Sequence, residues 1–268
     1  MNAVIDQMLK HRSIRKYKNR DVPRELLDKC LRAGTMASSS GNMQAYSIIV
    51  TREPAVRHAL FEPHFQQSMV LDAPVLLTFC ADFHRMRKWL EISRAPANFD
   101  NFMSFMIAAI DAVLVSQNVA LALESEGLGI CYMGTTLASC EKIAEILKCP
   151  EHVVPVVGFS VGYPDEEPSE RVRLPLKGLV HAETYQEYKT SDVQDIYQER
   201  EKLGWERYMS NAELREKVFE LGAENLAQIY TKVKYTRESH IQYSETVRRC
   251  LVEKEFLAPT PEDSPAWA

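Results

Sequence analysis

The spacing of apolar residues along the chain predicts a mixed helical and β fold. Apolar residues at helical spacing predict helices over residues 4–9, 23–34, 55–61, 102–127 and 139–147. Short apolar runs predict strands over residues 46–51, 75–81, 130–133 and 153–162. Residues 83–101 are expected to form a helix and a polar loop, and residues 183–258 are charged with helical spacing. The last ten residues contain three prolines and are expected to be disordered.

The segment 102–127 is the longest apolar stretch, and its length would span a bilayer core of roughly 30 Å. Polar residues recur in it every seven positions, at Ser104, Asp111, Asn118 and Ser125, which predicts one polar stripe. A lone membrane-spanning helix would place Asp111 near the middle of the bilayer, at a high cost in free energy. We therefore expect a buried central helix that is covered by the chain's own sheet and by a second subunit. Gly127 and Gly129 are expected to end it.

Composition and charge restrict the function. The chain has 268 residues, of which 26% are charged, and a formal net charge of -5, which argues against a nucleic-acid-binding protein.

The cysteines form no Cys-x-x-Cys pair and lie mostly in apolar patterns, so we expect buried free thiols in a reducing compartment. These are Cys30, Cys80, Cys131, Cys140, Cys149 and Cys250. The first residues show no secretory signal pattern, so a cytoplasmic location is expected. The seven histidines have no metal-ligand spacing, so no metal site is expected.

A basic run, His11 to Tyr17, carries the first candidate chemistry. If it is extended, Ser13, Arg15 and Tyr17 share a face; if it is helical, Arg12 and Arg15 do. Two guanidinium groups with a nearby hydroxyl suit a phosphate-bearing ligand. The same run is also typical of a solvated helix C-terminus.

Three further polar segments are candidates for ligand contacts. The run 37–44 is rich in Ser, Gly and Asn and is typical of a turn, although its hydroxyls and amides also suit a polar ligand. Small residues at 134–136 leave the backbone N-H groups approachable. Arg171 and Arg173 form a second two-arginine unit if the segment is extended, and the alternative is a surface strand.

Five motifs in order closely resemble the FMN-dependent nitroreductase family, nearest to its NADPH-flavin oxidoreductase and oxygen-insensitive nitroreductase branch. They lie at 11–15, 38–44, 79–83, 124–134 and 171–175, and the resemblance covers roughly residues 3–190. It implies an α+β fold, an α-β-α sandwich with a mostly antiparallel central sheet, in an intertwined homodimer with FMN at the subunit interface. It also implies two-electron transfer from NADPH or NADH through FMN to nitroaromatics, quinones or free flavin.

The resemblance assigns FMN contacts to several segments and leaves the chemistry to the cofactor, without a catalytic side chain. It places Arg15 near the N1/O2 edge of the flavin, Ser38 to Ser40 in the site of the neighbouring subunit, and Arg171 with Arg173 at the phosphate. Residues 132–135 would pass under the isoalloxazine, with a backbone N-H at N5. The expected contacts are His11, Arg12, Ser13, Arg15, Ser38, Ser39, Ser40, Gln67, Ser68, Met69, Tyr132, Met133, Gly134, Thr135, Arg171 and Arg173.

The chain departs from the family pattern in several places. Ala45 follows Gln44 where many relatives have Pro, and Met69, Thr135 and Arg171 replace more usual residues. The arginine-bearing loop that selects NADPH in relatives has no clear counterpart, so the choice between NADPH and NADH stays open. We expect an FMN-binding domain over 1–190, a helical extension packing on the dimer over 191–258, and a tail over 259–268. The alternatives are a same-fold flavoenzyme with another reaction, such as reductive dehalogenation with 205–258 as a lid, and a non-catalytic flavin-binding or sensing protein.

Overall fold

A computed structural model describes residues 2–258 of the chain. Within this range the chain forms two compact units, one of residues 2–169 and 243–258 and one of residues 170–242. The domain limits expected at 190 and 258 follow from the extent of the family resemblance and remain a prediction.

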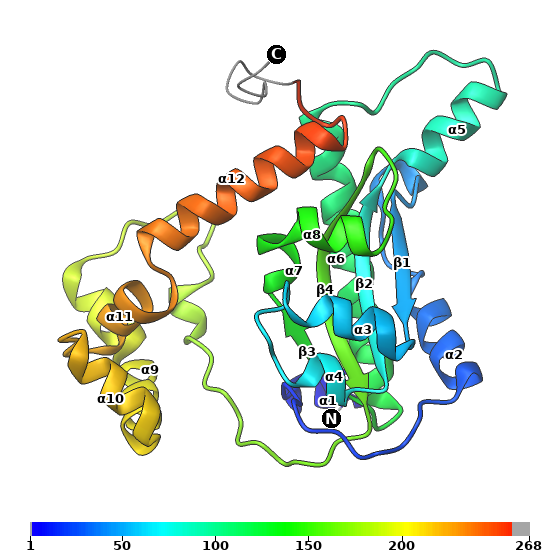
Figure 1. Cartoon of the computed structure of the whole chain (residues 1–268). Coiled ribbons are helices and arrows are strands. Elements are labelled where there is room, and N and C mark those ends of the chain that lie inside the picture. The colour runs from blue at the N-terminus through cyan, green and yellow to red at the C-terminus, as the bar shows by residue number, and fades with distance from the viewer. Residues whose placement is uncertain (1, 259–268) are drawn as a thin grey trace. The chain divides into compact units, whose positions relative to one another are not determined.

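The first unit is built on a four-stranded antiparallel sheet (Figure 1). Its strands are β1 (Tyr46–Thr51), β2 (Val75–Asp82), β3 (Gly129–Met133) and β4 (Val153–Gly162), in the order β1-β2-β4-β3. Every residue of β2 is buried, as expected for a central strand covered on both faces. The four strands confirm the prediction from the apolar runs.

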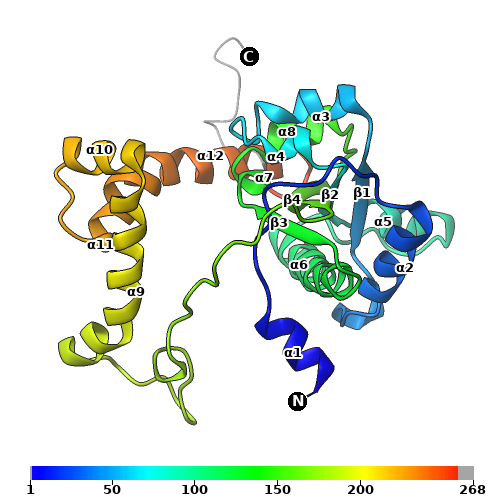
Figure 2. The same ribbon diagram turned by 90° about the horizontal axis from the view of Figure 1, so that it is seen from below.

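Alternation along β2 sends successive side chains to two different helical layers. Leu77 and Phe79 pack with α2 (Arg24–Gly34) and α6 (Phe102–Ser125). Leu76 packs with α3 (Pro54–Phe61), α4 (Met69–Asp72) and α8 (Cys140–Ile146). Figure 2 shows α6 on one side of the sheet and α3, α4 and α8 on the other. This arrangement confirms the predicted α-β-α sandwich.

Smaller elements complete the unit. These are helices α1 (Ala3–Leu9), α5 (His84–Ile92) and α7 (Thr135–Ala138), and α7 buries Thr135 and Thr136. Ser139 precedes α8 as predicted, but its side chain makes no capping hydrogen bond. All six cysteines are buried and free, as predicted.

Helix α6 packs against the sheet on one side only. Asn101 caps its start by accepting a hydrogen bond from the Ser104 N-H, and Gly127 follows its end with φ 78°. By length and composition this helix could cross a membrane, yet it covers the sheet and buries Asp111. The four residues of the predicted polar stripe differ in burial, since Ser104 and Asp111 are buried whereas Asn118 and Ser125 are exposed. A seven-residue repeat drifts by only roughly 20° per heptad around a straight helix, so the four positions keep to one stripe and only the burial of that stripe changes along the helix.

The second unit is helical, as the spacing over 183–258 predicts. It contains a 3-10 turn at Leu176–Gly178, α9 (Thr190–Ser210), α10 (Ala212–Glu220), α11 (Leu226–Ile229), a π-helical turn at Tyr230–Lys234 and the start of α12 (Arg237–Glu253). Its core consists of Tyr208, Val218, Ala223, Leu226 and Ile229. The end of α12 belongs to the first unit, where Cys250 and Leu251 are buried. The tail predicted to be disordered lies outside the described residues.

Candidate functional site

The basic segment that follows α1 runs beside strand β3. Ser13 forms a parallel bridge with Ile130, and the Ile14 N-H donates to the Ile130 carbonyl at 2.8 Å. Ile14 packs so closely on Gly129 that an added Cβ there would lie 2.6 Å from the Ile14 side chain. Gly129 therefore allows the basic segment to lie directly against the strand.

Polar contacts hold this segment in place. His11 Nδ1 lies 2.6 Å from the Glu124 carboxylate, and the Glu166 carboxylate accepts from the Arg15 N-H at 2.5 Å. The Tyr17 hydroxyl donates to the Ile14 carbonyl at 2.6 Å, and burial raises the pKa of Tyr17 well above its ordinary value, so the phenol stays protonated.

The two predicted guanidinium groups have different surroundings. Arg12 is half-buried and donates to the carbonyl of Lys10, the C-cap residue of α1. That contact fits the helix-end interpretation of the basic run. The Arg15 side chain is exposed, while its backbone is tied down by Glu166. Arg15 therefore offers a charged group on a fixed backbone.

The hydroxyl-bearing loop is anchored by a buried carboxylate that sequence analysis did not assign to the site. Its centre is a 3-10 turn, Ser40–Asn42, in which Gly41 and Asn42 have positive φ. Asp111 of α6 is 1% exposed and accepts from the Ser40 N-H at 3.0 Å and the Ala45 N-H at 3.2 Å. Ser38 is exposed, and Ser39 and Ser40 are half-buried.

The signal for this anchor was present in the sequence. Asp111 and Glu124 are the only charged residues of α6. Each holds a segment that carries predicted FMN contacts, Asp111 the loop around Ser40 and Glu124 the segment around His11. A charge in an otherwise apolar helix is therefore informative about the site.

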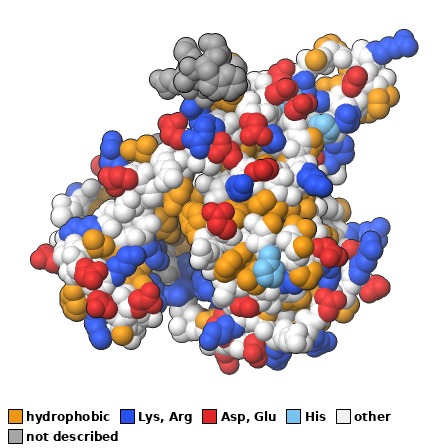
Figure 3. All heavy atoms as spheres, viewed as in Figure 1, with side chains coloured by type: hydrophobic (Ala, Val, Ile, Leu, Met, Phe, Trp, Pro, Cys, Tyr) orange, Lys and Arg blue, Asp and Glu red, His pale blue; other side chains and the backbone are white. Residues whose placement is uncertain are grey.

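The turn between α3 and α4 carries Gln67, Ser68 and Met69. Ser68 is exposed and Gln67 is half-buried, whereas Met69 packs in the core with Met133. A cofactor contact at these two methionines would thus involve their backbone atoms. Figure 3 shows hydrophobic side chains gathered on the face over α3 and α7.

Buried His64 joins this turn to the end of β3. Its Nδ1 lies 2.8 Å from Thr135 Oγ1, and both residues are buried. Burial lowers the pKa of His64 to about 4, so the imidazole is neutral near pH 7. The residue three positions before Gln67 is therefore hydrogen-bonded to Thr135, which belongs to a second group of predicted FMN contacts.

Residues 132–135 combine fixed side chains with an open backbone. The Tyr132 hydroxyl lies 3.0 Å from Ser116 Oγ, and burial raises the pKa of Tyr132 to about 12. Gly134 is exposed, and among the described residues no side chain beyond its two chain neighbours lies within 4 Å of the position that a Cβ would take there. The backbone at Gly134 is open to a ligand, as the small residues predicted.

Arg171 and Arg173 belong to the second unit and are exposed. Arg173 donates to the Arg171 carbonyl at 3.2 Å. Their assignment to the FMN phosphate remains a prediction.

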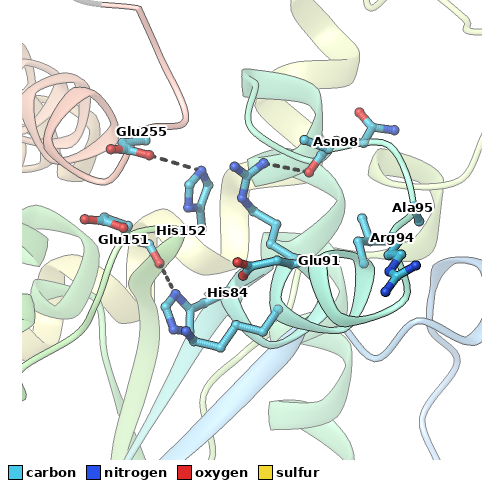
Figure 4. Close-up of a pocket in the computed structure, with 12 residues that line it drawn as sticks. His84, Glu91, Arg94, Ala95, Asn98, Glu151, His152 and Glu255 are labelled. Atoms are coloured by element: carbon cyan, nitrogen blue, oxygen red, sulfur yellow. Dashed lines mark hydrogen bonds and ion pairs between the residues drawn. The ribbon is translucent and has the colours of Figure 1, made fainter.

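A separate pocket of about 530 Å³ lies beside α5 (Figure 4). Its lining includes His84, Glu91, His152 and Glu255, and His84 Nδ1 donates to the Glu151 carbonyl at 3.1 Å. In the described part of the chain, none of the predicted FMN contacts lines this pocket. Within residues 2–258, no group of three or more His, Cys, Asp or Glu side chains is arranged to hold a metal ion.

Together these features define an α-β-α sandwich in which basic, hydroxyl-bearing and open-backbone segments are fixed around one antiparallel sheet. Residues 8–163 match the Nitroreductase family. The chain belongs to this family, which confirms the resemblance and the predicted fold.

Relatives and solved structures agree with this assignment. The FMN reductase (NADPH) of Bacillus subtilis (strain 168) is 35% identical over 187 residues, covering 69% of this chain and 75% of that protein. An oxidoreductase of Bacteroides fragilis NCTC 9343 has 38% identity and a TM-score of 0.86, covering 94% of this chain and 99% of its own. The NADPH:FMN oxidoreductase of Vibrio harveyi, complexed with NAD+, has 30% identity and a TM-score of 0.71, covering 92% and 98%.

Proposed function

We propose that this protein is an NAD(P)H-dependent FMN oxidoreductase that passes two electrons from NADPH or NADH through bound FMN to nitroaromatics, quinones or free flavin. The observation that carries this proposal is the match of residues 8–163 to the nitroreductase family, with relatives named as NADPH-dependent FMN reductases. The five motifs that the family shares all occur here, in the family's order.

The residues present suit FMN. Arg12 and Arg15 supply cationic donors, Ser39 and Ser40 supply hydroxyls, and Gly134 leaves the backbone approachable. When bound, FMN supplies the electron-transfer chemistry itself. The role of the chain is to orient it. Asp111 and Glu166 would do this indirectly by fixing the backbone of segments that would hold it, and Glu124 by holding the His11 ring.

The active form in this proposal is a homodimer, with FMN at the subunit interface and Ser38 to Ser40 contributed by the partner. Support comes from apolar surface that the single chain leaves exposed. On α6, Phe102, Met103 and Ile110 are each at least half exposed, and so are all four large apolar residues of α1. Exposed apolar surface of this extent is typical of an interface. The extension 191–258 is proposed to pack on the dimer.

The proposed location is the cytoplasm, since six buried free thiols suit a reducing compartment. The proposed partners are a second copy of the chain and a small-molecule electron acceptor. Neither nucleic acid nor a membrane is proposed as a partner.

Spectroscopy on the purified protein tests the function. The protein should carry a flavin absorbance that bleaches on anaerobic addition of NADPH or NADH and returns with a quinone, a nitrofuran or free FMN. Bleaching by neither coenzyme would overturn the proposal. Bleaching without turnover of any acceptor would favour a different flavoenzyme reaction, such as reductive dehalogenation, or a flavin-sensing role.

A further inference from the structure

His64 makes three hydrogen bonds, two through its backbone and one through its ring. Its N-H donates to the Leu60 carbonyl in α3 at 3.1 Å, and its carbonyl accepts from the Gln67 N-H at 3.3 Å. Its ring contacts the Thr135 hydroxyl, 71 positions away, at 2.8 Å. His64 therefore connects helix α3, the turn before α4 and the first residue of α7.

The turn that follows His64 is conformationally unusual. Phe65 and Gln66 are consecutive non-glycine residues with φ of 57° and 55°. Left-handed backbone is unfavourable for such residues and persists where the surrounding structure enforces it. The two residues directly precede Gln67, so the position of Gln67 and Ser68 depends on contacts that hold this turn in place.

The ring of His64 is suited to a fixed contact. It is 1% exposed, and a buried neutral imidazole carries one donor and one acceptor nitrogen. Only one orientation pairs Nδ1 with Thr135 Oγ1. Gly134, directly before Thr135, is the open backbone position of the site.

We infer that His64 is a positioning residue, which sets the Gln67–Met69 turn against the Gly134–Thr135 backbone through the Thr135 hydroxyl and so fixes the geometry of the flavin site. This role rests on the proposed function, because it concerns the same cofactor. His64 itself is not expected to touch FMN.

Substitutions at both ends of the hydrogen bond test this inference. His64→Phe keeps the ring and removes the bond, and His64→Asn retains an amide near the position of Nδ1. Thr135→Val removes the hydroxyl, and Thr135→Ser retains it. His58→Phe is the matched control, because His58 is an exposed histidine of α3. For each variant, FMN affinity is measured by flavin fluorescence, the visible circular dichroism of bound FMN is recorded, and thermal unfolding is followed without FMN.

His64→Phe and Thr135→Val should each weaken FMN binding by about tenfold and alter the circular dichroism, and the double variant should be about as weak as either single one. The Asn and Ser variants and the control should stay within about threefold of the unchanged protein. Unchanged FMN affinity and circular dichroism in both bond-removing variants, with only thermal stability reduced, would overturn the inference. Failure of the unchanged protein to bind FMN would instead overturn the proposed function.

Discussion

Replacing Asp111 by Asn should loosen the Ser40–Ala45 loop. In the native structure one carboxylate oxygen accepts from the Ser40 N-H at 3.0 Å and the other accepts from the Ala45 N-H at 3.2 Å. Asn has nearly the same shape but only one acceptor oxygen, so its NH2 group would face one of the two N-H donors. One charge-assisted bond is lost and a buried donor is left unpaired.

The magnitude follows from the burial of this site. Asp111 is 1% exposed, so water does not replace the lost partner. A hydrogen bond to a charged group contributes about 1.5–3 kcal/mol, and leaving a buried donor unpaired costs a similar amount. The two quantities overlap, so they do not add in full. We expect the Asn variant to lose about 2–4 kcal/mol in the free energy of unfolding.

Urea unfolding at one protein concentration measures this loss, and hydrogen exchange of the Ser40 and Ala45 amides locates it. Both amides should exchange faster in the Asn variant. Ser125→Ala is the control, because Ser125 lies on the same helix, is exposed, and bonds only to the nearby Ala122 carbonyl in the described structure. A loss below about 0.5 kcal/mol together with unchanged exchange of both amides would refute the anchoring role.

Three further predictions concern pH, redox potential and assembly. Because the pKa of His64 is about 4 in the folded chain and 6.5 in the unfolded chain, the unfolded chain binds more protons between these pH values. The free energy of unfolding should therefore fall as the pH drops from 6.5 to 4. Urea unfolding at several pH values should show a smaller fall in His64→Asn. Arg15→Met should lower the two-electron potential of bound FMN by roughly 30 mV in a titration at saturating FMN, for a contact with about 1.4 kcal/mol specific to reduced FMN. Arg173→Met should weaken FMN binding without changing this potential. Equal shifts in both variants would mean that the two arginines are assigned to the wrong ends of FMN. Ile110→Asp should place a charge on the exposed apolar face of α6 and yield a monomer in light scattering; a dimer of unchanged affinity would exclude this face from the interface.

The regular elements could be predicted because their signals are local. Strand β2 is a continuous apolar run, and helix α6 is a long apolar stretch closed by Gly127. Helix α7 was not predicted, since four residues cannot show a helical period. The predicted cap at Ser139 is wrong in its contact, because the residue type is typical of a cap but its side chain makes no capping hydrogen bond.

The candidate site was predictable as a set of segments but not as a geometry. Its motifs are short and contiguous, so their residues could be named. The contacts that fix them join positions far apart, 71 residues for His64 with Thr135 and 151 for Arg15 with Glu166. No spacing rule connects such pairs, and the tertiary fold alone brings them together.

Helix α6 gives these contacts a common physical basis. Asp111 holds the serine loop, Ser116 contacts Tyr132, and Glu124 holds His11, so three predicted cofactor segments depend on one rigid element. At a rise of 1.5 Å per residue, the anchors at 111 and 124 lie about 20 Å apart along the axis. The same helix also carries the exposed apolar residues Met103, Ile110 and Leu114. One helix therefore orients the predicted cofactor segments with its polar residues and offers its exposed apolar residues to a second subunit. In this proposal, contacts with the partner fix the helix itself, while Asp111 and Glu124 fix the cofactor segments within one subunit.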